Sequence, residues 1–273
     1  MKHLRVGFIG AGNMAAAMIE GLLAEGLPAE QICACDPASE RLDLLKQLGP
    51  LRTSSRNTDA VADADIVVLA VKPQAMASVL GDVREALVRE RCVILSIAAG
   101  LTLGSLEAQL GDGLSIVRCM PNTPALVREG AAALYENPAT STAQREIAAA
   151  VLGAVGTVCW LDNEAELDTV TALSGSGPAY FFFMMESMIA AGAELGMDEA
   201  TARELVVQTA LGAARMAGGS ELDLAELRRR VTSPGGTTEA AIKSMESTGF
   251  PTTIQSAVNA AASRSRELAA ELG

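Results

Sequence analysis

Apolar residues in the first 160 positions occur in short continuous runs, separated by longer segments in which they recur at helical spacing. Short apolar runs between turn residues are typical of strands that helices cover on both faces, and their alternation with helical segments predicts βαβ units. The predicted strands are 4–9, 31–35, 66–71, 93–98, 115–119, 131–135 and 157–161, with helices at 14–26 and 140–152. The pattern therefore predicts an α/β fold with a doubly wound, mainly parallel sheet.

The pattern changes after Asp162, where strand-like runs give way to long segments rich in Ala, Leu and Met. Their spacing is helical throughout. The predicted helices are 164–173, 179–196, 198–217, 223–231, 237–247 and 252–272. We therefore expect two domains, an α/β domain over residues 1–161 and an all-helical domain over residues 162–273.

One predicted helix of the second domain is apolar around almost its whole circumference. It contains three consecutive phenylalanines, Phe181–Phe183, followed by Met184, Met185, Met188 and Ile189. A helix of this kind must be covered on several sides. Since the second domain has only about 110 residues, we expect a second copy of the chain to cover it, with burial against the first domain as the alternative.

Composition narrows the classes of partner. The 273 residues include 21 basic and 33 acidic side chains, which gives a net charge of −12, and no cluster of Lys or Arg forms a basic stripe. A nucleic acid partner is therefore not expected. Glycines interrupt the apolar N-terminal stretch, and no later run reaches the roughly 20 apolar residues that cross a bilayer, so we expect neither a signal peptide nor a membrane span.

The numbers of cysteines and histidines limit which disulfides, catalytic triads and metal sites the chain can form. The five cysteines are odd in number and contain no CxxC pair, so we interpret them as reduced core residues of a cytoplasmic protein. The only histidine, His3, precedes the first predicted strand. A Ser-His-Asp triad, a Cys-His pair or a histidine-rich zinc site is therefore very hard to build, and no metal is expected.

The clearest motif is Gly10-Ala11-Gly12-Asn13-Met14-Ala15, between the first predicted strand and the first predicted helix. In this GxGxxA pattern the first glycine permits a tight turn, the second lets a pyrophosphate approach the main chain, and the alanine allows close helix packing. The N-terminus of the helix then offers N–H groups to the phosphates. The motif predicts a Rossmann-type dinucleotide-binding domain.

Asp36 follows the second predicted strand, where a carboxylate can accept hydrogen bonds from the adenosine ribose and repel a 2′-phosphate. This interpretation favours NADH and implies that an Asp36→Ala variant gains relative preference for NADPH. Ser39 and Arg41 lie just beyond it, and an arginine there can instead hold a 2′-phosphate. The choice between NADPH and NADH stays open.

Three further segments carry residues that packing alone does not require. In Val231-Thr232-Ser233-Pro234-Gly235-Gly236-Thr237-Thr238-Glu239, a proline and a glycine pair precede a predicted helix, which suits a carboxylate-binding helix N-terminus surrounded by hydroxyl groups. An ordinary capped turn is the alternative. The second segment, 173–180, is rich in Gly and Ser, with a flexible turn as the alternative. The third, 68–74, ends a strand with Lys72 and Pro73, and ligands bind at the C-terminal ends of strands in open α/β sheets.

These segments together resemble the pyrroline-5-carboxylate reductase family. The resemblance covers essentially the whole chain and rests on GFIGAGNMAAAM at 7–18, VLAVKPQ at 68–74, SIAAG at 96–100, RCMPNTPALVREG at 118–130, LSGSGPAY at 173–180 and VTSPGGTTEAAI at 231–242. It implies a Rossmann domain followed by a helical substrate-binding and dimerisation domain. It also implies a homo-oligomer built on dimers, which agrees with the expectation from the apolar helix.

The resemblance further implies which residues contact the ligands. The cofactor, NADPH or NADH, would contact Gly10, Gly12, Asn13, Met14, Ala15, Asn57, Ala70, Val71, Lys72, Pro73 and Ala98. The substrate, 1-pyrroline-5-carboxylate, would contact Glu221, Ser233, Gly235, Gly236, Thr237 and Thr238. Many members of the family use NADPH and lack an acidic residue at the position of Asp36, which is a departure of this chain.

The implied reaction is hydride transfer to the imine carbon, which yields L-proline. We expect Thr238 to hydrogen-bond the ring nitrogen, while N–H groups after Gly235 hold the carboxylate. A related β-hydroxyacid dehydrogenase is the rival enzyme, but by resemblance it needs a lysine early in the helical half, and no lysine occurs between Asp162 and Ile242. A dinucleotide-binding sensor without catalysis is the alternative of another class.

Overall fold

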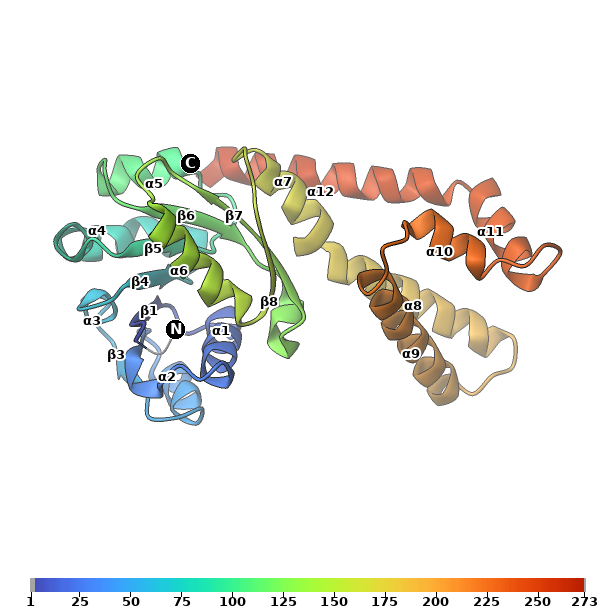
Figure 1. Ribbon diagram of the computed structural model, residues 1–273, viewed down its shortest axis with the longest axis horizontal. Helices are drawn as coiled ribbons and strands as arrows, with labels where there is room; N and C mark the ends of the chain where they lie inside the picture. The colour runs from blue at the N-terminus through green and yellow to red at the C-terminus, as the bar shows by residue number, and fades with distance from the viewer. Residues whose placement is uncertain (1–2, 273) are drawn as a thin grey trace. The chain divides into compact units, whose positions relative to one another are not determined.

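The computed structural model describes residues 3–272 and divides into two compact units (Figure 1). The first unit extends to Ser176 and also takes in the chain from Ala261 onward, and the second is Gly177–Ala260. The chain thus leaves the first unit once and returns to it through its last helix.

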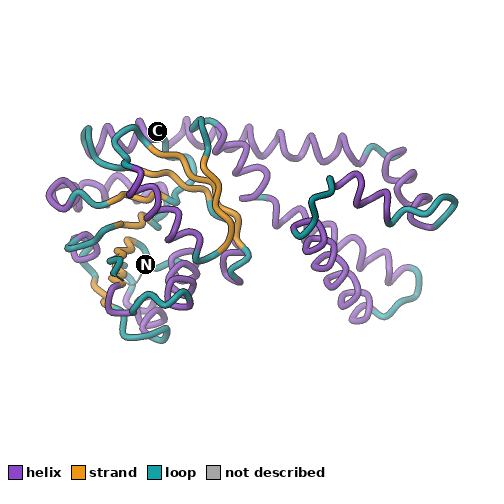
Figure 2. Tube along the Cα trace, in the orientation of Figure 1, coloured by secondary structure: helices purple, strands orange, loops and turns teal. Residues whose placement is uncertain are grey.

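The eight strands of the described chain form one sheet in the first unit, in the order β3-β2-β1-β4-β5-β6-β7-β8. Figure 2 shows these strands in orange. The strands are β1 Val6–Ile9, β2 Ile32–Cys35, β3 Arg52–Ser54, β4 Ile66–Leu69, β5 Val93–Ser96, β6 Ile116–Met120, β7 Gly130–Glu136 and β8 Gly156–Trp160. The first six are parallel, and their order 3-2-1-4-5-6 is that of a doubly wound dinucleotide fold. β7 pairs antiparallel with β6, and β8 runs parallel to β7.

Helices cover both faces of this sheet. On one face lie α1 Asn13–Ala24, α2 Ser39–Lys46 and α6 Thr142–Gly153, and on the other lie α3 Thr58–Val61, α4 Pro73–Glu90 and α5 Leu103–Leu110. Because successive strand residues point to opposite faces, Ile66 and Val68 join the first core layer while Val67 and Leu69 join the second. This double burial explains why the strands have no polar alternation.

The predicted Rossmann-type α/β fold is confirmed, and each of the seven predicted strands lies within two residues of an observed one at both ends. β3 was not predicted, because this short edge strand reads Arg-Thr-Ser and none of its side chains is buried. The helices α2 to α5 were not predicted either. The polar sequence of α2 contributes only Leu42 and Leu45 to the core.

The compact first unit continues beyond the predicted boundary at residue 161. After β8 the chain forms α7 Glu166–Val170 and a π-helical turn, Thr171–Gly175, and Leu167 of α7 is buried. The last helix, α12 Phe250–Leu272, brings Ser265 back to this segment, where its hydroxyl donates to Asp168 Oδ1 at 2.6 Å. Packing of α7 against β6 and β7 attaches this segment to the sheet, although its sequence is helical.

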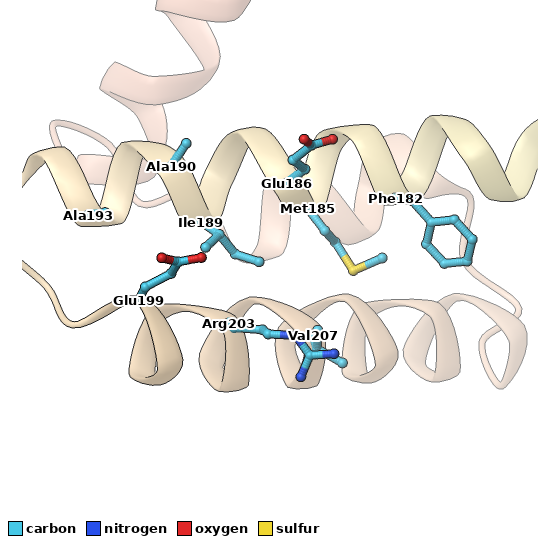
Figure 3. A pocket seen from close by; sticks show the side chains of 9 residues that line it. All are labelled: Phe182, Met185, Glu186, Ile189, Ala190, Ala193, Glu199, Arg203 and Val207. Atoms are coloured by element: carbon cyan, nitrogen blue, oxygen red, sulfur yellow. The ribbon is translucent and has the colours of Figure 1, made fainter.

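The second unit is entirely helical, as predicted for this half of the chain. It contains α8 Gly177–Glu194, α9 Glu199–Gly218, α10 Leu224–Arg230, α11 Thr237–Ser247 and the first part of α12. α8 and α9 pack side by side (Figure 3). Among residues 3–272, no helix has the length and apolar character needed to span a membrane.

Candidate active site

The Gly10–Gly12 turn joins β1 to α1 at the carboxyl edge of the sheet. Gly10 has a φ of +101°, and a Cβ there would lie 2.5 Å from the carbonyl oxygen of Ala70, so only glycine fits. Gly12 precedes α1, no side chain caps this helix, and within the described chain no atom lies within 4 Å of where its Cβ would be. The first N–H groups of α1 therefore have no capping side chain, and the space beside Gly12 is open, as a phosphate site requires.

The strands next to β1 bring the other predicted cofactor contacts to the same edge. Ile9, Leu69 and Ser96 are register neighbours at the carboxyl ends of β1, β4 and β5. The residues after these ends include Ala70, Val71, Lys72, Pro73 and Ala98. Pro73 begins α4, which also lacks a side-chain cap at Lys72. Four predicted segments, 10–15, 70–73, 98 and the end of β2, thus meet at one edge.

Asn57 immediately precedes α3, beyond the end of β3, and its side-chain amide donates to Asp82 Oδ2 at 3.1 Å. Lys72 is exposed and Asn57 is half-buried, so both side chains are accessible from solvent. Their contact with a cofactor stays a prediction.

Asp36 follows β2 and is 5% exposed. Its Oδ2 accepts a hydrogen bond from the Ala11 N–H at 2.8 Å, and its Oδ1 accepts one from the Ala38 N–H at 2.9 Å. Arg41 Nη1 lies 3.6 Å from Oδ2. The carboxylate therefore contacts the glycine turn itself, an arrangement that the motif alone does not predict.

A set of polar contacts holds the segment after β8 against the end of β6. Arg118 Nη1 lies 2.6 Å from Glu164 Oε1, the same oxygen that accepts the Leu103 N–H at 2.6 Å. The buried Asn122 accepts the Ala131 N–H and donates to the carbonyl of Ser174. Arg118 and Asn122 lie in the motif RCMPNTPALVREG, and no role for either residue could be predicted from the sequence.

The Gly and Ser-rich segment 173–180 is helical rather than a turn. The Ser176 N–H donates to the carbonyl of Thr171 at 2.8 Å, which closes the π-helical turn. A Cβ on Gly175 would lie 2.6 Å from Met120 Cε, so this glycine permits close packing against β6. Its composition thus reflects backbone packing.

The glycine turn of the second unit, Ser233–Gly236, precedes α11. Gly235 has a φ of +69°, and the Gly236 N–H donates to the carbonyl of Ser233 at 3.0 Å. No side chain caps α11 at Gly236, and the first main-chain bond into the helix is the one that Ala240 N–H donates to Gly236. The N–H groups of Thr237 and Thr238 lie at the start of the helix and suit a carboxylate.

Glu239 completes this turn from within the helix. Its Oε2 accepts the Gly235 N–H at 2.6 Å, and its Oε1 lies 2.9 Å from Lys243 Nζ. The hydrogen bond from Lys243, followed by that from Gly235, lowers the pKa of Glu239 below its ordinary value. The turn thus brings together five of the six predicted substrate contacts, whereas Glu221 lies before α10 in the same unit and is exposed.

The five cysteines are free, and most of them are withdrawn from solvent. Cys33, Cys35, Cys92 and Cys119 are buried and only Cys159 is exposed. Burial raises the pKa of Cys92 to about 12 and the pKa of Cys119 well above its ordinary value. Within residues 3–272, no three side chains of His, Cys, Asp or Glu cluster closely enough to hold a metal ion.

An apolar groove runs between α8 and α9 in the second unit (Figure 3). Phe182, Met185, Ile189 and Val207 line it, together with Glu186 and Arg203. Gly177 is the only buried residue among those described in α8, and Phe181, Phe182 and Phe183 are 60%, 63% and 70% exposed. The single chain therefore leaves this helix largely uncovered.

Both halves of the chain match known protein families. Residues 164–268 match the family described as pyrroline-5-carboxylate reductase dimerisation, and residues 5–100 match the family described as NADP oxidoreductase coenzyme F420-dependent. The pyrroline-5-carboxylate reductase of Pseudomonas aeruginosa is 56% identical over 273 residues, which is 100% of both chains. The enzyme of the same name from Haemophilus influenzae is 45% identical, with 98% of each chain covered.

Solved structures agree over the same length. A pyrroline-5-carboxylate reductase from Coxiella burnetii superposes with a TM-score of 0.94 at 41% identity, covering 97% of this chain and 98% of that one. A Plasmodium falciparum pyrroline carboxylate reductase with NADP bound gives a TM-score of 0.86 at 31% identity, covering 98% and 99%.

Proposed function

The chain belongs to the pyrroline-5-carboxylate reductase family, and from this premise we propose that it reduces 1-pyrroline-5-carboxylate to L-proline with NADPH or NADH. The observation that carries the proposal is a pair of helix N-termini without side-chain caps, one after each glycine turn. The first, at α1, suits a pyrophosphate, and the second, at α11, suits a single carboxylate. A dinucleotide and a carboxylated imine are two ligands with these anionic groups.

The residues of the first unit fit a dinucleotide. Gly12 leaves room for a pyrophosphate above α1, where Asn13, Met14 and Ala15 begin the helix. Ala70 to Pro73, Ala98 and Asn57 would line the rest of the site, with Asp36 behind the glycine turn. When bound, the reduced nicotinamide supplies the hydride that the reaction needs.

The residues of the second unit would bind and orient the imine. The N–H groups of Thr237 and Thr238 hold its carboxylate, with Ser233 and the Gly235-Gly236 turn around it. The Thr238 hydroxyl hydrogen-bonds the ring nitrogen and so fixes the approach of the imine carbon. Glu221 is assigned to the same substrate site.

The second unit would also form the interface with another copy of the chain. The exposed phenylalanines of α8 supply an apolar surface, and the matched dimerisation region, residues 164–268, contains it. The assembly is a homodimer or a larger oligomer built from dimers. A cytoplasmic location is part of the proposal and rests on the five cysteines, none of which forms a disulfide.

The test is turnover of 1-pyrroline-5-carboxylate, followed by the loss of absorbance of NADPH or NADH. Turnover to proline distinguishes the proposal from a β-hydroxyacid dehydrogenase and from a sensor that binds dinucleotide without catalysis. No turnover with either cofactor would contradict the proposal.

The role of Thr238 has its own test. A Thr238→Ala variant should lower kcat by about tenfold or more, which corresponds to about 1.4 kcal/mol of barrier. Thr248→Ala, at the other end of α11, is the matched control, since its hydroxyl donates only to carbonyls of its own helix. An unchanged kcat in Thr238→Ala would contradict the role assigned to this hydroxyl.

A further inference from the structure

The end of β2 holds the cofactor turn at two successive N–H groups. The Gly10 N–H donates to the carbonyl of Cys35 at 2.7 Å, and the Ala11 N–H donates to Asp36 Oδ2 at 2.8 Å. Ala11 is 7% exposed, so its N–H cannot turn to water without moving the main chain. The conformation of the turn therefore depends on the carboxylate of Asp36.

The other contacts of Asp36 fix the carboxylate in this position. Oδ1 accepts the Ala38 N–H at 2.9 Å, which ties the side chain to the start of the next helix, and Arg41 lies 3.6 Å from Oδ2. A guanidinium and two N–H groups thus face the two oxygens and offset their negative charge. A carboxylate engaged in this way exerts a weaker repulsion on a 2′-phosphate than a free one.

We propose that Asp36 is a positioning residue for the dinucleotide site, which holds the Gly10–Gly12 turn in place for NADPH and NADH alike and does not discriminate between them. The proposal rests on the proposed function, because it takes the turn as the pyrophosphate site. It differs from the interpretation of Asp36 as a reader of the ribose, which requires opposite effects on the two cofactors when the carboxylate is removed.

The experiment measures binding of NADPH and of NADH separately, by cofactor fluorescence in the absence of the imine, and then steady-state kinetics. In Asp36→Ala the dissociation constants of both cofactors should rise by about tenfold, the usual effect of losing a hydrogen bond to a charged group. Their ratio should stay within about twofold of the wild-type ratio. In steady-state kinetics the KM of NADPH and the KM of NADH should rise to the same extent.

Asp36→Asn separates the two roles even if Asp36→Ala does not fold. The amide of asparagine has one acceptor oxygen, so it can replace only one of the two N–H contacts, and it carries no charge. A positioning role predicts that Asp36→Asn loses less affinity than Asp36→Ala, and that the loss is equal for NADPH and NADH. A ribose-reading role predicts weaker NADH binding and stronger NADPH binding.

Asp43→Ala is the matched control, because Asp43 lies on α2, the helix that follows Asp36, and is exposed beside Lys46. It should bind both cofactors like the wild type. A change in the NADPH to NADH ratio in either Asp36 variant, or unchanged binding of both cofactors in Asp36→Ala, would overturn the proposal. Because binding is measured without imine, failure of the reductase assay would contradict the proposed function and leave this test intact.

Discussion

Glu239 places a carboxylate in the turn that is proposed to bind the carboxylate of the substrate. Its Oε2 accepts a hydrogen bond from the Gly235 N–H, and its Oε1 pairs with Lys243 on the same helix. The lysine offsets the negative charge of the carboxylate. The Gly235 N–H is therefore used internally, and the N–H groups of Thr237 and Thr238 remain for a ligand. We infer that Glu239 stabilises the turn and does not itself contact the substrate.

Removing this carboxylate should weaken substrate binding. A Glu239→Ala variant should raise the KM for the imine about fivefold, because the Gly235 turn loses its hydrogen bond, while kcat changes less. Glu239→Gln keeps an acceptor and should have a smaller effect. Glu246→Ala, an exposed acidic residue on the same helix, is the control, and an unchanged KM in Glu239→Ala would contradict the inference.

The contact should also depend on pH in one direction. The pKa of Glu239 is lowered from an ordinary value of 4.5, first by Lys243 and then by the Gly235 N–H. The ionised form of Glu239 makes the contact. The stabilisation of the turn is therefore fully present above pH 4.5, the ordinary pKa, and is lost as the pH falls through the lowered pKa. The KM for the imine should therefore differ between the wild type and Glu239→Gln at neutral pH and be the same in both at acidic pH. A difference that persists at acidic pH would contradict this assignment.

Residue types at the two glycine turns could be predicted from the sequence, because their backbone requirements are local. Gly10 and Gly235 both have positive φ, which glycine adopts readily. The partners of Asp36 could not be predicted in this way. Asp36 lies 25 residues from Ala11, and the hydrogen bond between them depends on the side-chain conformation in the folded sheet.

At the scale of elements, the contact between β1 and α3 requires a glycine at position 7. A Cβ on Gly7 would lie 1.9 Å from the carbonyl oxygen of Ala60, so main-chain atoms approach here without a side chain between them. The neighbouring residues Val6 and Phe8 point to the opposite face and are buried. The strand that carries the phosphate turn is thereby fixed between two layers.

Gly7→Ala should therefore destabilise the fold. The added methyl group forces β1 and α3 apart, and overpacking of this kind costs about 1–3 kcal/mol. Gly81→Ala is the matched control, because Gly81 lies within α4 with no atom of the described chain within 4 Å of its Cβ position, and there alanine should stabilise the helix by about 0.5–1 kcal/mol. The free energy of unfolding from denaturant titration measures both, and equal stability of the two variants would contradict the argument.

Elements with a strong hydrophobic pattern could be predicted, and those defined by tertiary contacts could not. The buried runs that became β1, β4 and β5 have four consecutive apolar or small residues each, all buried. The break predicted at 174–178 is confined to a bend at Ser176, because Ser174 hydrogen-bonds the carbonyl of Val170 and Gly175 packs against Met120. Local propensity was overridden there by packing against β6.

At the scale of the whole molecule, the units of folding differ from the halves seen in the sequence. The sequence changes character at residue 162 and the matched dimerisation region begins at residue 164, but compact packing of the first unit continues to Ser176. The ion pair between Arg118 and Glu164 explains the difference, because it joins the sheet to the first residues of the helical half. An ion pair between two residues far apart in the chain leaves no periodic pattern in the sequence, so it could not be predicted.

The exposed face of α8 makes a prediction about assembly. Phe182 is 63% exposed in the single chain and lines the groove between α8 and α9. In a twofold dimer each substitution acts twice. Burial of one phenylalanine contributes about 1.5–3 kcal/mol, so Phe182→Glu should weaken the dimer by about 3–6 kcal/mol, or two to four orders of magnitude in Kd.

Leu44→Glu provides a matched control for this effect, because Leu44 is equally exposed at 63% but lies on α2 of the first unit. Mass measured by light scattering over a dilution series should give dimers or larger assemblies for the wild type and for Leu44→Glu, and monomers for Phe182→Glu at micromolar concentration. Wild-type assembly in Phe182→Glu at every concentration would place the interface elsewhere. The apolar groove of α8 and α9 would then need another occupant, since its phenylalanines remain uncovered in the single chain.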